Sequence, residues 1–198
     1  YMVMGLAIGG TLAIAGAIFY ILHHIVVKTN LFLIGGLIAK KTGSSDLKKI
    51  GGLYKASPYL AMLFLIPALS LGGIPPLSGF WAKFSVIKAG LDGGHYLLVG
   101  AALLVGILTL YSMTKIWNEA FWKDPEEDSE ASEADRSLNP AAVIPCVFLA
   151  AITLFLGFWS GPLLELSFAA SEQLLNPERY IEFVLNPIDH EDSIALVE

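Results

Sequence analysis

Long apolar runs separated by short polar segments organise this chain of 198 residues. Several of the runs reach the roughly 17–25 residues that an α-helix needs to cross the hydrocarbon core of a bilayer. The pattern predicts membrane spans over residues 12–38, 58–71, 77–90, 95–117 and 139–159, after the tail of an earlier span over 1–8. The predicted fold class is therefore all-α and integral to the membrane. Because the chain starts at Tyr1 inside an apolar run, we expect a C-terminal fragment of a longer polytopic protein.

The composition supports a membrane protein, since 55% of the residues are hydrophobic and only 15% are charged. A soluble domain carries about 25% charged residues. The net charge of −6 is concentrated in one loop, because seven acidic residues fall within 124–135. An acidic loop argues against binding to nucleic acid. With Cys146 as the single thiol and no cluster of metal ligands in the sequence, we expect no metal site and no cofactor.

The segment 70–91 interrupts the helical pattern. Pro75 and Pro76 remove two backbone donors, and Gly73 and Gly79 loosen the chain around them. Irregular backbone at membrane depth is tolerated only where protein buries it or where it lines a wet cavity. The sequence therefore predicts a broken helix that resumes near residue 77.

Ionisable side chains occur inside the first complete span. On a helix, Tyr20, His24 and Lys28 follow one another at spacings of four and share one face, with His23 about a quarter-turn away. A lysine at the centre of a lone membrane helix costs at least about 2.5 kcal/mol, so Lys28 must face protein or water. A desolvated lysine and a neutral histidine can both exchange protons near neutral pH, which predicts a proton relay. A lysine paired for packing, and histidines with satisfied interhelical hydrogen bonds, are the competing interpretations.

Lys83 is a second candidate for proton transfer, and it lies beside the predicted break. It lies four residues after Gly79. Many transporters build an ion site from a broken helix and a neighbouring ionisable residue, because the break frees backbone groups and admits water. The alternative is a lysine whose stem lies along apolar surface while its ammonium reaches the interface.

The last part of the chain, 161–198, differs from what precedes it. Its apolar and polar residues alternate at helical spacing, and it is too polar to cross a bilayer. We expect an amphipathic helix at the membrane interface or against a neighbouring subunit, followed by a polar C-terminal tail.

The motifs, in their order, resemble a known family. "HHIVVKTNLFLIGGLI", the linker "GGLYKASP" and "ALSLGGIPPLSGFWAK" are similar to the antiporter-like membrane subunits of Mrp-type multisubunit Na⁺/H⁺ antiporters, respiratory complex I and membrane-bound hydrogenases. The ending "FWSGPLLELSFAASEQLLNPERYIEFVL" is most similar to the MrpD-type subunits of these antiporters, and the resemblance covers residues 1–185. It implies a bundle built of two inverted five-helix repeats, of which this chain holds the C-terminal part, with the broken helix near Pro75 and Pro76.

The resemblance also implies roles for individual residues. Lys28 matches the lysine of the central polar axis, His24 the histidine one turn before it, and Lys83 the terminal ionisable residue of the second half-channel; His23 is kept as a further candidate. The expected function is a proton-translocating subunit of a monovalent cation (Na⁺)/H⁺ antiporter, and not an enzyme. The expected partners are other subunits of a hetero-oligomeric complex, the lipid bilayer, H⁺ and Na⁺, in the cell membrane of a prokaryote.

Two alternatives stay open at this point. A redox-driven pump of the complex I or hydrogenase type would use the same lysines, although the chain has no iron–sulfur or haem motif of its own. The second alternative is a structural scaffold, in which the lysines only pair with neighbouring groups and hold the complex together. Orientation is also open, because five lysines within 40–55 favour a cytoplasmic loop by the positive-inside rule, whereas the family topology places this loop outside.

Overall fold

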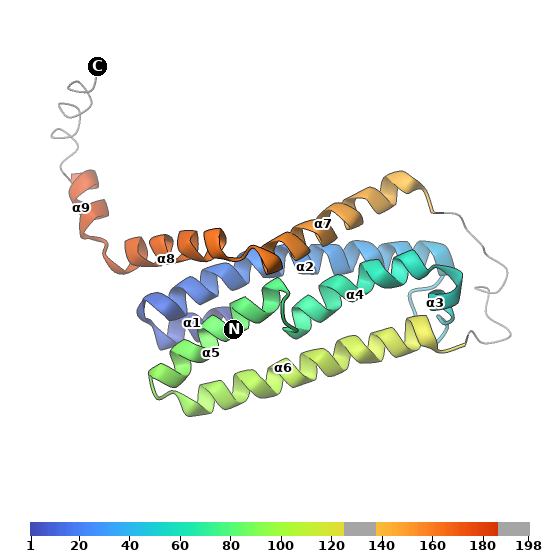
Figure 1. The fold of residues 1–198 in the computed structure, drawn as a ribbon, viewed down its shortest axis with the longest axis horizontal. Coiled ribbons are helices and arrows are strands. Elements are labelled where there is room, and N and C mark those ends of the chain that lie inside the picture. Colours follow the sequence, from blue (N-terminus) through green and yellow to red (C-terminus); the bar gives the residue numbers. More distant parts are fainter. Residues whose placement is uncertain (125–137, 186–198) are drawn as a thin grey trace, which may run out of the picture.

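A computed structural model describes residues 1–124 and 138–185, and all of its regular elements are helices. Figure 1 shows the longer helices lying roughly along one long axis, with α9 turned away from it. The elements are α1 (Met2–Ile8), α2 (Gly10–Thr42), α3 (Leu53–Ala56), α4 (Pro58–Gly72), α5 (Ser78–Asp92), α6 (Tyr96–Trp117), the π-helical turn η1 (Asn118–Trp122), α7 (Pro140–Phe158), α8 (Gly161–Leu175) and α9 (Glu178–Leu185). The predicted all-α fold is confirmed.

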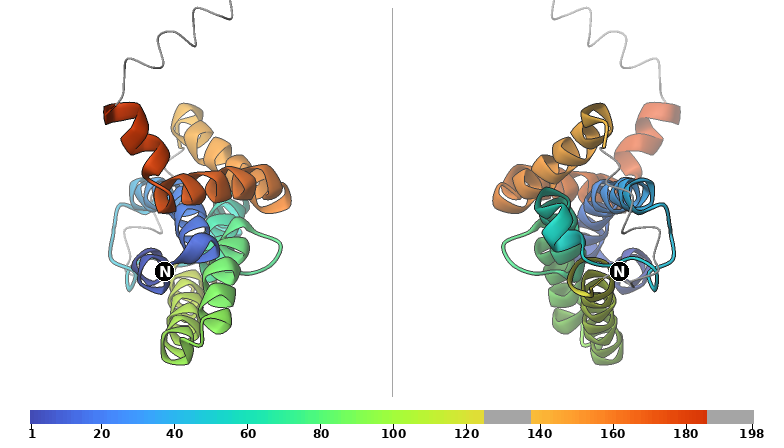
Figure 2. Two further views of the ribbon diagram at one scale, coloured as in Figure 1. Left: turned by 90° about the vertical axis from the view of Figure 1, so that its left-hand side faces the viewer. Right: turned by 90° about the vertical axis from the view of Figure 1, so that its right-hand side faces the viewer.

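Helix α2 is the central element of the bundle. It contains 33 residues and contacts α1, α4, α5, α7 and α8 (Figure 2). The chain turns into it from α1 through Gly9 and Gly10, whose φ angles of 71° and 77° suit glycine. It ends at Gly43, another left-handed residue, whose N–H bonds the carbonyl of Ala39. The helix extends beyond the predicted range of 12–38 at both ends.

Helices α4 and α5 follow one another along the long axis of the bundle (Figure 1). Each has 15 residues, or about 22 Å at 1.5 Å per residue, which is short of the roughly 30 Å hydrocarbon core. The ranges 58–71 and 77–90 thus correspond to α4 and α5, the two halves of one broken helix. The chain leaves α4 through Gly73, at a φ of 88°, and Ser78 starts α5. The predicted break near Pro75 and Pro76 is confirmed.

Helix α6 lies on the far side of the broken helix from α7 (Figure 1). With η1 it forms one apolar stretch, Tyr96–Trp122. In the described part of the chain, this stretch, α2 and α7 are long and apolar enough to cross a membrane. Much of α6 is exposed leucine, isoleucine and valine, a surface suited to lipid or to further membrane helices.

An aromatic cluster closes one end of the bundle. The rings of Phe64 and Trp117 lie 5.2 Å and 4.8 Å from that of Phe121, which is buried in η1. The polar connection after α2 is tied to the same end, because the N–H of Gly52 donates to the carbonyl of Lys123. Together these contacts fix the ends of α2, α4 and α6 relative to one another.

Helix α8 packs against the N-terminal half of α2. Its Leu163 and Leu164 contact the buried cluster that contains Phe19, and Ser171 Oγ donates to the carbonyl of Thr11 at 2.9 Å. One face of this amphipathic helix is therefore part of the bundle, a position that the sequence did not predict. Helix α9 follows it, and its described side chains are exposed.

Gly157 lets α7 approach the helix break closely, and its carbonyl accepts a hydrogen bond from Trp81 Nε1 at 3.0 Å. A Cβ at this position would lie 2.8 Å from the carbonyl oxygen of Pro76 and 2.9 Å from both Leu77 Cα and Ser78 N. These are backbone atoms, so the helix itself would have to move away.

We expect Gly157→Ala to lower the stability of the full-length protein by about 1–3 kcal/mol, as other overpacking substitutions do. The measurement is the thermal unfolding midpoint of the purified protein in detergent. Gly100→Ala is the matched control, since a Cβ there meets no atom within 4 Å. Equal midpoints for the two variants would contradict this description of the α7 contact.

Candidate functional site

The break between α4 and α5 contains a chain of polar side chains. His23 on α2 is fully buried, and its Nδ1 lies 2.8 Å from Ser78 Oγ at the start of α5. Ser78 Oγ lies 3.0 Å from Ser70 Oγ near the end of α4, and that hydroxyl accepts a longer bond of 3.3 Å from the N–H of Gly79. His23 thus connects the central helix to both halves of the broken helix.

Lys83 lies one turn beyond Gly79 on α5 and turns back into the bundle. The residue is only 7% exposed. Its Nζ donates to the carbonyls of Leu71 and Gly72 at 2.8 Å and 2.9 Å. These carbonyls belong to the last turn of α4, where the helix dipole favours a cation. Lys83 therefore does not reach for the interface, and the broken helix itself supplies the oxygens that bind it.

Aromatic rings lie between Lys83 and the face of α2 that carries Tyr20 and His24. The ring of Tyr1 lies 5.3 Å from Lys83 Nζ and stacks on Tyr20 at 5.2 Å. Tyr20 in turn stacks on His24 at 5.7 Å and meets His23 edge-on at the same distance. The predicted neighbourhood of Tyr20 and His24 on one face is present, and it leads through Tyr1 to Lys83.

Lys28 lies in a different environment. It is half-buried, and its Nζ lies 5.9 Å from the centre of the Phe32 ring. Together with Phe32, Ser44 and Met113 it lines a largely apolar groove of about 590 Å³ between α2, the following loop and the end of α6. Within residues 1–124 and 138–185, Lys28 forms no hydrogen bond and no ion pair. The structure brings His23, His24 and Lys83 together, and it places Lys28 farther along α2, at this groove.

Negative charge is scarce around these cations. Helices α2 and α4 contain no Asp or Glu, and α5 contains only Asp92, whose carboxylate binds Lys88 at 2.6 Å at the exposed end of the helix. In the part of the chain that the structure describes, no group of three or more metal-ligating side chains is present. In the described residues, Lys83 is therefore bound by main-chain carbonyls and lies near the ring of Tyr1, and Lys28 lies near the ring of Phe32.

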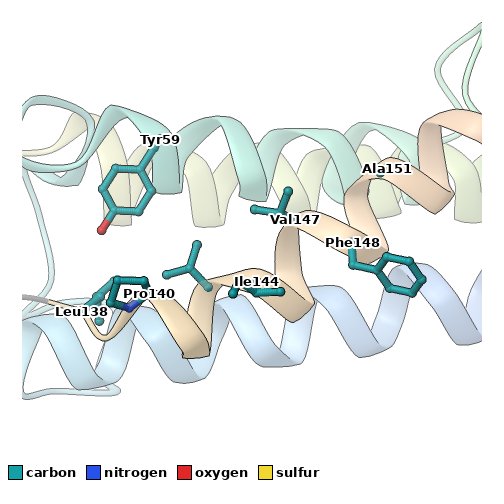
Figure 3. A pocket seen from close by; sticks show the side chains of 8 residues that line it. Tyr59, Leu138, Pro140, Ile144, Val147, Phe148 and Ala151 are labelled. Atoms are coloured by element: carbon teal, nitrogen blue, oxygen red, sulfur yellow. The ribbon is translucent and has the colours of Figure 1, made fainter.

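A second groove, of about 640 Å³, lies between the start of α4 and α7 (Figure 3). Its walls are apolar side chains such as Ile144, Val147 and Phe148, and Tyr59 provides the one ionisable group among its lining residues. This chemistry does not fit proton transfer, so the groove is no candidate for that function.

The sequence did not predict the roles of Ser70, Ser78 and Asn30. Asn30 is fully buried on α2, and its amide faces Cys146 O and Ala150 N of α7 at 3.3 Å and 3.2 Å. The sequence contains only a weak indication of these polar contacts: one serine on each side of the Gly–Pro segment, and one amide in an apolar run.

Comparison with known proteins identifies relatives of this chain. The family described as "NADH:quinone oxidoreductase/Mrp antiporter, TM" matches residues 1–114, more than half of the chain. The D-type subunit of the Na(+)/H(+) antiporter of Alkalihalophilus pseudofirmus is 49% identical over 185 residues, which are 93% of this chain and 37% of that protein. The chain thus spans a little over a third of that relative's length.

Two solved structures are similar in fold. A chain of the Mrp complex from Dietzia sp. DQ12-45-1b superposes with a TM-score of 0.85 at 34% identity, covering 94% of this chain and 42% of that one. A chain of respiratory complex I from Thermus thermophilus superposes with a TM-score of 0.64 at 25% identity, covering 83% and 36%. The Mrp relative is the more similar of the two by both measures. The chain belongs to the NADH:quinone oxidoreductase/Mrp antiporter transmembrane family.

Proposed function

We propose that this chain is part of a proton-translocating membrane subunit of a multisubunit Na⁺/H⁺ antiporter in the cell membrane of a prokaryote. The greater similarity to the Alkalihalophilus antiporter protein and to the Mrp complex supports an antiporter over other members of the family. In this role the protein is a transporter component that works with other subunits of a membrane complex.

The observation that carries the proposal is the environment of Lys83. Its ammonium is buried and bound by two main-chain carbonyls at a helix break, without a carboxylate on α2 or α4 to neutralise it. A buried cation with no counter-charge is costly, and loss of its proton relieves that cost. Carbonyl oxygens also tolerate the neutral amine, which still has two N–H donors. Lys83 can therefore hold or release a proton without a change in its partners.

The remaining predicted residues extend the route along α2. His23 contacts the break directly, and His24 faces Lys83 through the stacked rings of Tyr20 and Tyr1. Lys28 then lies one turn beyond His24, at the groove. We propose that protons pass between Lys83 and Lys28 by way of the histidines and intervening water. Repulsion between neighbouring positive charges would release one proton as the next arrives.

A redox-driven pump is the second candidate, because complex I has a chain of the same fold. The same lysines would serve in it, and the energy source would lie in other subunits. Proteins that copurify with the full-length chain separate the two: small membrane subunits support the antiporter, and flavin and iron–sulfur proteins support the redox complex. A scaffold role is distinguished by the variants below.

Lys83→Ala in the full-length, assembled complex should reduce Na⁺-driven proton movement by about 10²-fold, the contribution of a positioned proton-transfer group. The measurement is the pH change in vesicles after addition of Na⁺. Lys88→Ala on the same helix is the matched control, because Lys88 is exposed and, within the described residues, pairs with Asp92 alone. Full transport by Lys83→Ala in an intact complex would refute the proposal.

Lys28→Ala should also reduce Na⁺-driven proton movement strongly, because it removes the ammonium from the middle of α2. The same vesicle assay applies, with Lys40→Ala as control, since Lys40 is exposed in the last turn of that helix. Subunit stoichiometry is measured in parallel. If Lys28→Ala and Lys83→Ala both lose subunits from the complex, and transport falls only in proportion, the lysines are scaffold residues and the transport role is wrong.

A further inference from the structure

We propose that the hydroxyls of Ser78 and Ser70 form, with His23, a hydrogen-bonded proton relay between the central helix and the helix break. The inference rests on the proposed function and assigns a role in it to two serines of the motif "ALSLGGIPPLSGFWAK" that the sequence analysis left without one. Ser78 and Ser70 act by passing protons, and His23 is the end of the relay on α2.

The hydrogen bonding of these serines differs from that of most other hydroxyls in the bundle; Ser171, which donates to the carbonyl of Thr11, is an exception. Hydroxyls inside membrane helices commonly bond the carbonyl four residues earlier in their own helix. Such bonds are made by Ser85, Thr109, Ser112, Thr114, Thr153 and Ser167. Ser70 and Ser78 instead bond each other across the break, at 3.0 Å, and Ser78 bonds His23 at 2.8 Å. Their hydroxyls are thus available to a chain that links three helices.

The partners of the chain permit two opposite arrangements of its protons. In one, His23 Nδ1–H donates to Ser78 and Ser78 donates to Ser70. In the other, Ser70 donates to Ser78 and Ser78 donates to Nδ1. In both, the N–H of Gly79 donates to Ser70 Oγ, at 3.3 Å. Each hydroxyl can donate once and accept twice, so both arrangements satisfy every atom between the two ends.

The free end of the relay is His23 Nε2, which is buried and has no hydrogen-bond partner among the described residues. An unsatisfied buried polar atom costs about 1–3 kcal/mol, which favours a water molecule at this atom. A proton delivered to Nε2 makes His23 cationic. Nδ1 then gives its proton to Ser78 Oγ as Ser78 gives its own to Ser70 Oγ, and Ser70 releases its proton to water in the break. One proton enters at Nε2 and one leaves at Ser70, with no net change in the three side chains apart from the tautomer of His23.

The relay ends beside the site that holds Lys83. Ser70 immediately precedes Leu71 and Gly72, whose carbonyls bind Lys83 Nζ. Gly79 keeps the two halves close enough, because a Cβ there would lie 1.8 Å from the carbonyl oxygen of Ser70 and 3.0 Å from His23 Cε1. A proton released at Ser70 is therefore delivered to the break that Lys83 occupies.

The test compares Ser78→Ala, Ser78→Thr and Ser85→Ala in the full-length, assembled complex. Ser78→Ala should lower Na⁺-driven proton movement in vesicles about tenfold or more, as expected for loss of a proton-transfer group. Ser78→Thr keeps the hydroxyl and should restore transport. Ser85→Ala is the matched control, since Ser85 is also buried on α5 and its hydroxyl donates to the carbonyl of Trp81 in the same helix. If Ser78→Ala fails to assemble, Ser70→Ala and Ser70→Thr provide the same comparison, because Ser70→Ala cuts the chain and leaves the His23–Ser78 bond intact.

Wild-type transport by the alanine variant would overturn the relay, and so would a threonine variant no better than the alanine variant in a complex of normal stoichiometry. Lys83→Ala separates this result from the proposed function. If Lys83→Ala abolishes transport and Ser78→Ala does not, the relay alone is wrong. If both variants transport normally, the proposed function is wrong as well.

Discussion

The structure depends on the way a membrane helix is interrupted so that its own backbone can bind a cation. Gly73 ends α4, and the carbonyls of its last turn are left without helical N–H partners. In an apolar setting such carbonyls require a donor, and Lys83 provides it from the other half of the broken helix. The break and the buried ammonium therefore stabilise each other: without the lysine the carbonyls lose their partner, and without the break the lysine has nothing to bind.

This mutual requirement explains why the surroundings are so closely packed and so short of acidic residues. Gly157 on α7 and Gly79 on α5 each leave room for backbone and no room for a side chain. A carboxylate next to Lys83 would hold its proton firmly, whereas carbonyls, hydroxyls and an imidazole bind without adding a charge. The arrangement suits a group that changes its protonation state inside a bundle whose helices keep their positions.

Part of this site could be predicted from the sequence. Pro75 and Pro76 indicated the break because proline cannot supply the backbone donors of a helix, and the spacing of Tyr20 and His24 indicated a shared face because that spacing is one helical turn. Hydropathy did not indicate that α4 and α5 are halves of one helix, since two apolar segments give the same signal end to end or side by side. Ser78 was missed because a lone serine in an apolar run usually bonds its own helix.

The length of α2 has a consequence for how the protein sits in a bilayer. Its 33 residues extend for about 50 Å, well beyond the roughly 30 Å thickness of the hydrocarbon layer. Such a mismatch is accommodated by tilt or by the helix ends standing in the headgroups. Lys28 is about 27 Å from one end of the helix and about 21 Å from the other. It therefore lies within about 3 Å of the helix midpoint, and tilting α2 about its midpoint to fit membranes of different thickness leaves Lys28 near mid-depth.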